Sequence, residues 1–340
     1  MVIDLVVTAR TLVQAGKGIL AADETPGTIG KRFEALDISS TAQTRCAYRE
    51  LLVTAPGLQG AISGVILQDE TFRQMTSTGL PFPQALMQRG MLPGIKVDTG
   101  AKPLAKAPGE KVTEGLDGLR ERIAEYVELG ARFAKWRAVI TIGDGIPTQA
   151  CIAANAHALA RYAALCQEGG LVPIVEPEVL MDGDHSIESC FAATVTTWRR
   201  VFAELAEQGV ALDAMVLKPS MILPGKQHAT QATVDEVARR TVEGLRQTVP
   251  AAVPGIAFLS GGQSPDLATR HLRAINALGP QPWQLTFSFG RALQDEALSA
   301  WKGEAASVGK AQAALLRRTE SVAAARSGVD DPVNAAPPRR

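Results

Sequence analysis

Several ionisable side chains interrupt short segments of the chain that are otherwise apolar. In chain order they are Asp23, Lys96, Asp98, Lys135, Arg137, Glu176, Glu178 and Lys218. Residues two positions apart on an extended strand face the same side of it, as Lys135 and Arg137 would. A structural salt-bridge layer explains any single one of them as well as a function does. Burying the whole set is costly unless every charge is paired, so the set favours a reactive site.

These residue types point to carbonyl chemistry at a lysine. A lysine in an apolar site near other cations has a lowered pKa, so part of it is a neutral amine that forms a Schiff base with a carbonyl. Lys218 is the best candidate nucleophile, because apolar residues precede it and Pro219 fixes the chain after it. The step from carbinolamine to iminium needs carboxylates that move protons, and Glu176, Glu178 and Asp23 supply them.

Two later segments predict a phosphate site. Each combines Ser with Gly and precedes a predicted helix, so that backbone N–H groups and a helix N-terminus face an anion. The residues expected to bind phosphate are Ser260, Gly261, Gly262, Ser288, Gly290 and Arg291. Lys31 and Arg32, which follow Thr28, are candidates for a second anion site, although a solvated helix start explains them equally well.

The segments that carry these residues predict parallel strands, because near-continuous apolar runs suit strands that are buried on both faces. Eight such segments alternate with helical ones, at residues 18–23, 62–68, 94–99, 133–142, 172–178, 214–221, 255–262 and 284–291. This alternation predicts βαβ units and fits a closed (β/α)8 barrel, or TIM barrel. The charged groups lie toward the carboxyl ends of the strands, where barrel enzymes carry their active sites.

The barrel accounts for most of the chain. We expect one barrel domain over residues 1–322, with an N-terminal helix, followed by a flexible extension over residues 323–340. This last segment consists largely of Ala, Pro, Asp and Arg and has little to bury.

Composition excludes several classes of protein. The 340 residues include 35 Lys and Arg and 35 Asp and Glu, and this zero balance argues against broad binding of nucleic acid or an anionic membrane. No apolar run approaches the ~20 residues of a membrane helix, and the first residues do not resemble a secretory signal. The four Cys are scattered without a CxxC pair, which predicts free thiols and a cytoplasmic location. The four His do not cluster, and no metal site is predicted.

Seven motifs in the same order along the chain resemble those of class I (Schiff-base) fructose-1,6-bisphosphate aldolases. They lie at residues 16–24, 94–98, 133–137, 174–178, 217–219, 258–264 and 286–292. The resemblance implies a (β/α)8 barrel, usually assembled as a homotetramer, that requires no metal or other cofactor. It also implies reversible cleavage of fructose 1,6-bisphosphate to dihydroxyacetone phosphate and glyceraldehyde 3-phosphate, as in glycolysis and gluconeogenesis.

The resemblance implies a role for each matching residue. Lys218 would be the Schiff-base lysine, Glu176 the general acid and base, and Asp23 the group that takes the proton of the C4 hydroxyl. Lys135 and Glu178 would support charge around the intermediate. The C1 phosphate would bind at Arg291, Ser260, Gly261 and Gly290. The remaining hydroxyls and the C6 phosphate would bind near Lys96, Arg137, Lys31, Arg32 and Thr28.

The sequence departs from the family pattern at two points. Phe289 stands where many relatives have Tyr, and the segment before Arg340 lacks the tail Tyr of animal relatives. One alternative is another phosphosugar Schiff-base aldolase that prefers fructose 1-phosphate or sedoheptulose 1,7-bisphosphate. The other alternative is a scaffold without catalytic activity, which would be expected to have lost site residues.

Overall fold

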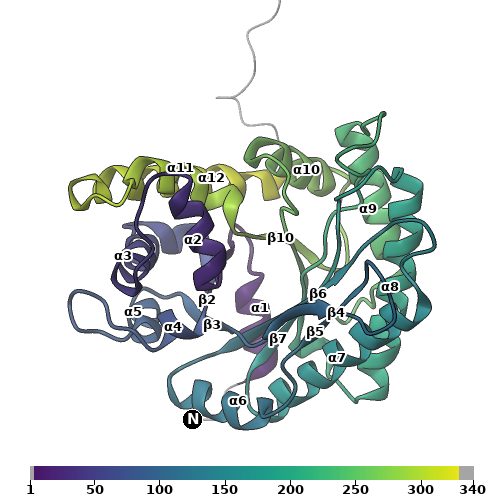
Figure 1. The fold of residues 1–340 in the computed structure, drawn as a ribbon, viewed down its shortest axis with the longest axis horizontal. Coiled ribbons are helices and arrows are strands. Elements are labelled where there is room, and N and C mark those ends of the chain that lie inside the picture. The colour runs from purple at the N-terminus through teal and green to yellow at the C-terminus, as the bar shows by residue number, and fades with distance from the viewer. Residues whose placement is uncertain (1–3, 329–340) are drawn as a thin grey trace, which may run out of the picture.

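The structure is a computed structural model that describes residues 4–328 (Figure 1). Eight parallel strands close into a barrel in the order β1-β10-β9-β8-β7-β6-β3-β2, which confirms the predicted fold. The strands are β1 (Gly18–Ala22), β2 (Ile62–Leu67), β3 (Leu92–Lys96), β6 (Phe133–Ile140), β7 (Val172–Val179), β8 (Val216–Leu217), β9 (Gly255–Phe258) and β10 (Gln284–Phe289).

All eight predicted strand segments contain a strand, but β8 is much shorter than expected. The backbone N–H of Lys218 still donates to the carbonyl of Val175 at 2.8 Å. Pro219, the next residue, has no N–H and ends the ladder on that side. Its carbonyl accepts from Leu259 at 3.0 Å, so the chain beyond β8 stays attached to the segment after β9.

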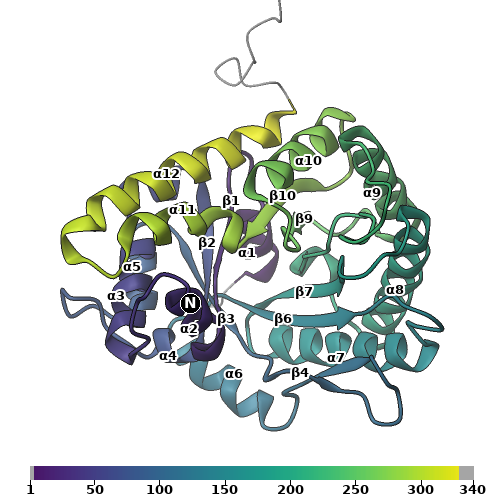
Figure 2. The same cartoon turned by 45° about the horizontal axis from the view of Figure 1, so that its top comes forward.

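Helices surround the strands (Figure 2). Their bounds are α1 (Leu5–Leu12), α2 (Pro26–Glu34), α3 (Ala42–Val53), α4 (Asp69–Phe72), α5 (Phe82–Gln88), α6 (Leu119–Glu128), α7 (Gln149–Glu168), α8 (Ile187–Glu207), α9 (Val234–Thr248), α10 (Pro265–Ala277), α11 (Arg291–Trp301) and α12 (Val308–Ala324). Local sequence sets the start of α10: the Ser264 side chain accepts a hydrogen bond from the Leu267 N–H, and Pro265 lies in the first helical turn.

An antiparallel hairpin follows β3 and was not predicted from the sequence. It consists of β4 (Gly100–Pro103) and β5 (Lys111–Glu114).

The barrel interior changes character along its axis. A buried apolar cluster includes Leu12 of α1 together with Phe133, Ile174 and Val216 of the strands. Ser63 joins α1 to the barrel, because its hydroxyl donates to the carbonyl of Leu12 at 2.6 Å. Helix α1 therefore packs against one end of the barrel interior, and the charged residues lie farther along the same strands.

The C-terminal helix extends past the predicted boundary of the flexible tail. Helix α12 continues to Ala324, a 3-10 turn follows at Ala325–Ser327, and Ala325 is fully buried. The Arg326 guanidinium donates to the carbonyls of Gln14 at 2.5 Å and Leu285 at 3.1 Å. An Ala-rich sequence forms a good helix, and small side chains pack closely, so residues 323–328 belong to the fold. The rest of the predicted tail, residues 329–340, lies outside the described residues.

The cysteine prediction is confirmed: all four thiols are free, with three buried and Cys46 partly exposed. Within residues 4–328, none of the helices is both long and apolar enough to span a bilayer.

Candidate active site

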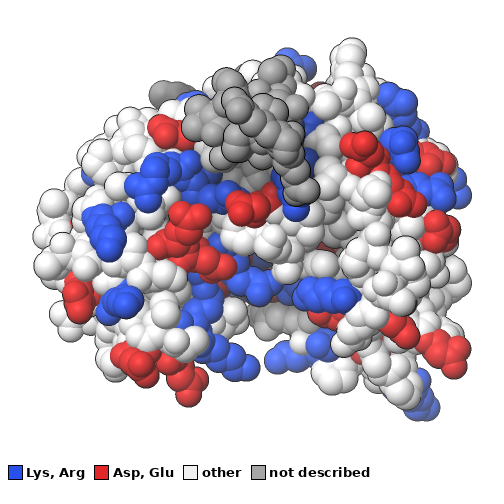
Figure 3. All heavy atoms as spheres, turned by 90° about the horizontal axis from the view of Figure 1, so that it is seen from above, with Lys and Arg blue, Asp and Glu red and all other residues white. Residues whose placement is uncertain are grey.

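A cavity of about 530 Å³ lies at the carboxyl ends of the strands. With one exception, every side chain or glycine predicted for the site lines it: Asp23, Thr28, Arg32, Lys96, Lys135, Arg137, Glu176, Glu178, Lys218, Ser260, Gly261, Gly262, Ser288, Gly290 and Arg291. Its lining contains seven Lys or Arg and six Asp or Glu residues, so its charges are nearly balanced. On the face shown in Figure 3, basic side chains gather around a hollowed region, with acidic side chains among them.

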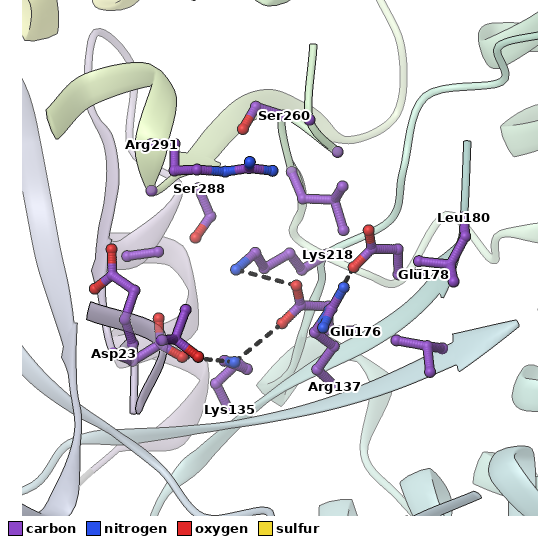
Figure 4. A pocket seen from close by; sticks show the side chains of 18 of the residues that line it. Asp23, Lys135, Arg137, Glu176, Glu178, Leu180, Lys218, Ser260, Ser288 and Arg291 are labelled. Atoms are coloured by element: carbon purple, nitrogen blue, oxygen red, sulfur yellow. Dashed lines mark hydrogen bonds and ion pairs between the residues drawn. The ribbon is translucent and has the colours of Figure 1, made fainter. Parts of the chain in front are cut away.

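Four charged side chains form a continuous chain on one side of the cavity (Figure 4). Lys218 Nζ lies 3.3 Å from Glu176 Oε1, and Glu176 Oε2 lies 3.5 Å from Lys135 Nζ. Lys135 Nζ also contacts Asp23 Oδ2 at 2.6 Å. Lys135, Glu176 and Lys218 are each 3 % exposed, so these ion pairs are shielded from water.

Strand periodicity explains how these charges meet. On β7, Val172 and Ile174 belong to the apolar interior cluster, and Glu176 is the next residue on that face. On β6, Lys135 likewise follows Phe133 at a spacing of two. Lys218 follows Val216 in the same way. Each strand thus places apolar side chains deep in the barrel and a charged one at the mouth.

The ion pairs shift the pKa values of Asp23 and Lys135 toward the charged forms of both side chains. Burial alone would raise the pKa of Asp23, but the charges of Lys135 and Lys218 outweigh it and lower this pKa to about 2. Burial would lower the pKa of Lys135, but Asp23 and Glu176 outweigh that effect and raise it. Asp23 is therefore a carboxylate, and Lys135 an ammonium, throughout the neutral range.

A second set of pairs fixes the neighbouring wall. Arg137 Nε contacts Glu178 Oε2 at 2.5 Å, and Lys96 Nζ contacts Asp98 Oδ1 at 2.5 Å. Asp98 also accepts from the backbone N–H of Arg137 at 3.2 Å and of Gly100 at 3.1 Å. Asp98 therefore joins β3, β6 and the start of β4, and it belongs to the cavity lining although no role was predicted for it from the sequence.

The opposite side of the cavity holds polar side chains that the described part of the chain leaves without partners. The Ser288 hydroxyl is buried and has no hydrogen-bond partner among residues 4–328. Within residues 4–328, the Arg291 guanidinium forms no ion pair, although every other basic side chain of the lining forms one. Gly261 and Gly262 have φ values of +58° and +81°, which leave this turn without side chains. Arg291 begins α11, so a helix N-terminus faces the same space.

Lys31 is the one predicted site residue that does not line the cavity. It is exposed on α2, whereas the adjacent Arg32 turns inward to Glu24 at 2.5 Å and Asp295 at 3.0 Å. Successive helical residues point about 100° apart, so two adjacent basic residues do not share one face. Thr28 lines the cavity, and its hydroxyl lies 3.0 Å from that of Thr25.

Among the lining residues that were not predicted from the sequence are Asp182 and Lys226. Both lie in loops, after β7 and β8, and they form an ion pair of 3.1 Å with each other. The search for charges inside apolar segments gives no signal for a loop residue, because loops are polar in any case.

The three tyrosines of the chain, Tyr48, Tyr126 and Tyr162, are buried, and none lines the cavity. Phe289, which stands where many relatives have Tyr, is also buried. Its ring packs against that of Phe287 with centroids 5.5 Å apart, a contact that does not require the tyrosine hydroxyl. Among the described residues, no group of three or more His, Cys, Asp or Glu side chains is arranged to hold a metal ion.

Comparison with known proteins gives one consistent result. Residues 4–335 match the family model of class-I fructose-bisphosphate aldolase, a glycolytic family. A probable class 1 fructose-bisphosphate aldolase of Xylella fastidiosa is 58% identical over 294 residues, which are 86% of this chain and 88% of the relative. A cytosolic fructose-bisphosphate aldolase of Arabidopsis thaliana is 52% identical over 316 residues, or 93% of this chain and 88% of that protein. The aldolase of Plasmodium falciparum, crystallised with TRAP and a small-molecule inhibitor, superposes with a TM-score of 0.94 at 49% identity, covering 95% of this chain and 94% of that one.

Proposed function

The chain belongs to the class-I fructose-bisphosphate aldolase family, and from this premise we propose that Lys218 is the lysine through which it cleaves its substrate. The reaction is the reversible cleavage of fructose 1,6-bisphosphate to dihydroxyacetone phosphate and glyceraldehyde 3-phosphate. Enzymes of this class are lyases that use a lysine Schiff base instead of a metal ion. The observation that carries the assignment is the buried contact of Lys218 Nζ with Glu176 Oε1 at 3.3 Å. The second carboxylate oxygen of Glu176 lies 3.5 Å from Lys135 Nζ.

Schiff-base formation requires two proton transfers beside Lys218. The amine, after losing a proton, adds to the C2 carbonyl of the open-chain sugar and gives a carbinolamine. Loss of water then requires a proton donor at the departing hydroxyl. Glu176 lies 3.3 Å from the Lys218 nitrogen, within the reach expected of a general acid and base. Lys135 Nζ lies 3.5 Å from the other carboxylate oxygen of Glu176 and so helps to hold this carboxylate beside Lys218.

Carbon–carbon cleavage requires a base and an electron acceptor. Asp23, held as a carboxylate by Lys135, accepts the proton of the C4 hydroxyl. The C3–C4 bond breaks, C4 becomes the aldehyde of glyceraldehyde 3-phosphate, and the bonding electrons form an enamine as the iminium nitrogen becomes neutral. Protonation of the enamine at C3 and hydrolysis of the imine then release dihydroxyacetone phosphate. Glu178, paired with Arg137, contributes charge at the neighbouring wall.

The unpartnered polar groups on the other side of the cavity suit the C1 phosphate. Arg291 supplies a cation, Ser288 and Ser260 supply hydroxyls, and the Gly261-Gly262 turn and the start of α11 leave backbone N–H groups accessible. We assign the C6 phosphate and the sugar hydroxyls to the side lined by Thr28, Arg32, Lys96 and Arg137.

Three further assignments rest on the family membership. We propose that the enzyme is a homotetramer, that it acts in the cytoplasm, and that residues 4–328 fold as one domain. The cytosolic location stated for the Arabidopsis relative supports the proposed location. The single closed barrel supports the proposal of one domain. Light scattering on the purified protein tests the proposed homotetramer. A mass near four times 35.9 kDa is expected, and the mass of a monomer contradicts the proposal.

Product analysis tests the proposed reaction. The purified enzyme is incubated with fructose 1,6-bisphosphate in the presence and absence of a chelator, and the two triose phosphates are quantified. Equal amounts of both products, unaffected by the chelator, are expected. Loss of activity on chelation contradicts the Schiff-base assignment. A preference for fructose 1-phosphate or sedoheptulose 1,7-bisphosphate over fructose 1,6-bisphosphate contradicts the substrate assignment.

A further inference from the structure

The loops that follow β7 and β8 are hydrogen-bonded to each other at the rim of the cavity. The backbone N–H groups of Gly225, Lys226 and Gln227 donate to the carbonyls of His185, Met181 and Gly183, all between 2.8 and 2.9 Å. The contact is so close that a Cβ on Gly225 would lie 2.2 Å from the Gly183 oxygen. The backbone around Lys226 is therefore held in place, and this residue lines the cavity from a fixed point.

The Lys226 side chain reaches the glycine turn on the unpartnered side of the cavity. A Cβ built on Gly262 would lie 2.9 Å from Lys226 Nζ and 3.3 Å from Arg291 Nη2. The two cations therefore converge on the same point beside Gly262. Two like charges held this close repel each other, and an anion placed between them relieves that repulsion.

The present partner of Lys226 is a weak one. Lys226 Nζ lies 3.1 Å from Asp182 Oδ1, but the side chains are 43 % and 67 % exposed. Exposed ion pairs contribute little to stability, since water screens them, and they exchange readily. The buried pairs of Lys135 and Lys218 have no such freedom. Lys226 is thus the one lining lysine, among the described residues, whose carboxylate partner is predominantly exposed.

We propose that Lys226 binds the phosphate that Arg291 binds, and that Asp182 competes with this phosphate for the lysine. The proposal rests on the proposed function, because it adds a residue to the phosphomonoester site of that reaction. When the phosphate binds, the Lys226 ammonium leaves Asp182 and contacts a phosphate oxygen instead. Lys226 is a substrate-binding residue in this account, and Asp182 sets its availability.

Two variants test the proposal because they change the phosphate affinity in opposite directions. Lys226→Gln removes the cation, and we expect KM for fructose 1,6-bisphosphate to rise about 10-fold, with kcat changed less than about 2-fold. Asp182→Asn frees the lysine, and the inhibition constant of inorganic phosphate is expected to fall about 3-fold. Lys226→Arg is expected to retain most of the affinity. Lys310→Gln, at an exposed position on α12, is the matched control and is expected to resemble the wild type.

Calorimetric titration of each protein with inorganic phosphate gives a readout that does not require catalysis. Weaker binding by Lys226→Gln and tighter binding by Asp182→Asn support the proposal. Unchanged binding by Lys226→Gln overturns it, and so does equal weakening by both variants, which indicates a purely structural ion pair. Failure of the proposed function would be seen separately, as a wild type that binds phosphate but forms no reducible adduct on Lys218.

Discussion

On one side of the cavity, Asp23, Lys135, Glu176 and Lys218 are buried and paired with one another. On the other side, Ser288 has no hydrogen-bond partner and Arg291 forms no ion pair within the described part of the chain. On the paired side the ion pairs hold Asp23 as a carboxylate in the resting enzyme, with its pKa lowered to about 2. The unpartnered side keeps its donors available for a ligand. This contrast separates groups that perform proton transfer from groups that hold phosphate, and the following substitutions test that separation.

The largest effect is expected for Lys218. Lys218→Met removes the amine and keeps the length of the side chain, so no Schiff base forms, and kcat is expected to fall by a factor of about 10³ or more. A steady-state assay of fructose 1,6-bisphosphate cleavage measures it. Near-normal activity in this variant would assign the nucleophile to another lysine, and circular dichroism controls for folding.

Removing the acid at Glu176 is expected to have the next largest effect. Glu176→Gln keeps the shape but cannot transfer a proton, and kcat is expected to fall between about 10² and 10⁴-fold with little change in KM. Both neighbouring lysines lose their shared counter-charge, so the thermal midpoint is expected to fall as well. A change confined to KM would place Glu176 in binding rather than in proton transfer.

Arg291 provides the matching test on the unpartnered side. Arg291→Met is expected to raise KM for fructose 1,6-bisphosphate about 100-fold, because a charge-assisted contact to phosphate is lost. Because Arg291 forms no ion pair with the described residues, its removal leaves none of their charges unpaired, and the unfolding temperature is expected to stay within about 2 °C of the wild type. Lys135→Met is the comparison variant and is expected to be strongly destabilised, since it leaves Asp23 buried and unpaired. Equal destabilisation of both variants would remove the distinction between the two sides.

The smallest effect is a dependence of stability on pH. The pKa of Asp23 is lowered from 3.8 to about 2 in the folded protein, so its ionised form stabilises the fold above pH 4. That contribution, about 2 kcal/mol, is lost as the pH falls from 4 to 2. Urea unfolding at several pH values is expected to show a shallower acid loss in Asp23→Asn than in the wild type. Parallel curves would show that Asp23 is not coupled to its lysines.

The sequence was sufficient for the parts of the molecule that follow strand periodicity. Glu176 and Lys218 stand out because a charge in an apolar strand is costly, and two-residue alternation places it on one face. The same reasoning could not find Asp182 or Lys226, because loop residues have no periodicity and polar loops are ordinary. Lys31 and Arg32 could not be distinguished from the sequence, because two adjacent basic residues on a helix do not reveal which one faces the cavity. The packed segment around Ala325 was mistaken for tail because small residues bury little area individually, although they permit close packing.

Trapping the covalent intermediate tests the central claim most directly. The enzyme is incubated with dihydroxyacetone phosphate, reduced with borohydride, digested and mapped by mass spectrometry. We predict one adduct, on the peptide that contains Lys218, with none in Lys218→Met. Arg291→Met is expected to form the same adduct at higher dihydroxyacetone phosphate concentrations. An adduct on Lys135 or another lysine, or no adduct in the wild type, would contradict the assignment of Lys218 as the Schiff-base lysine.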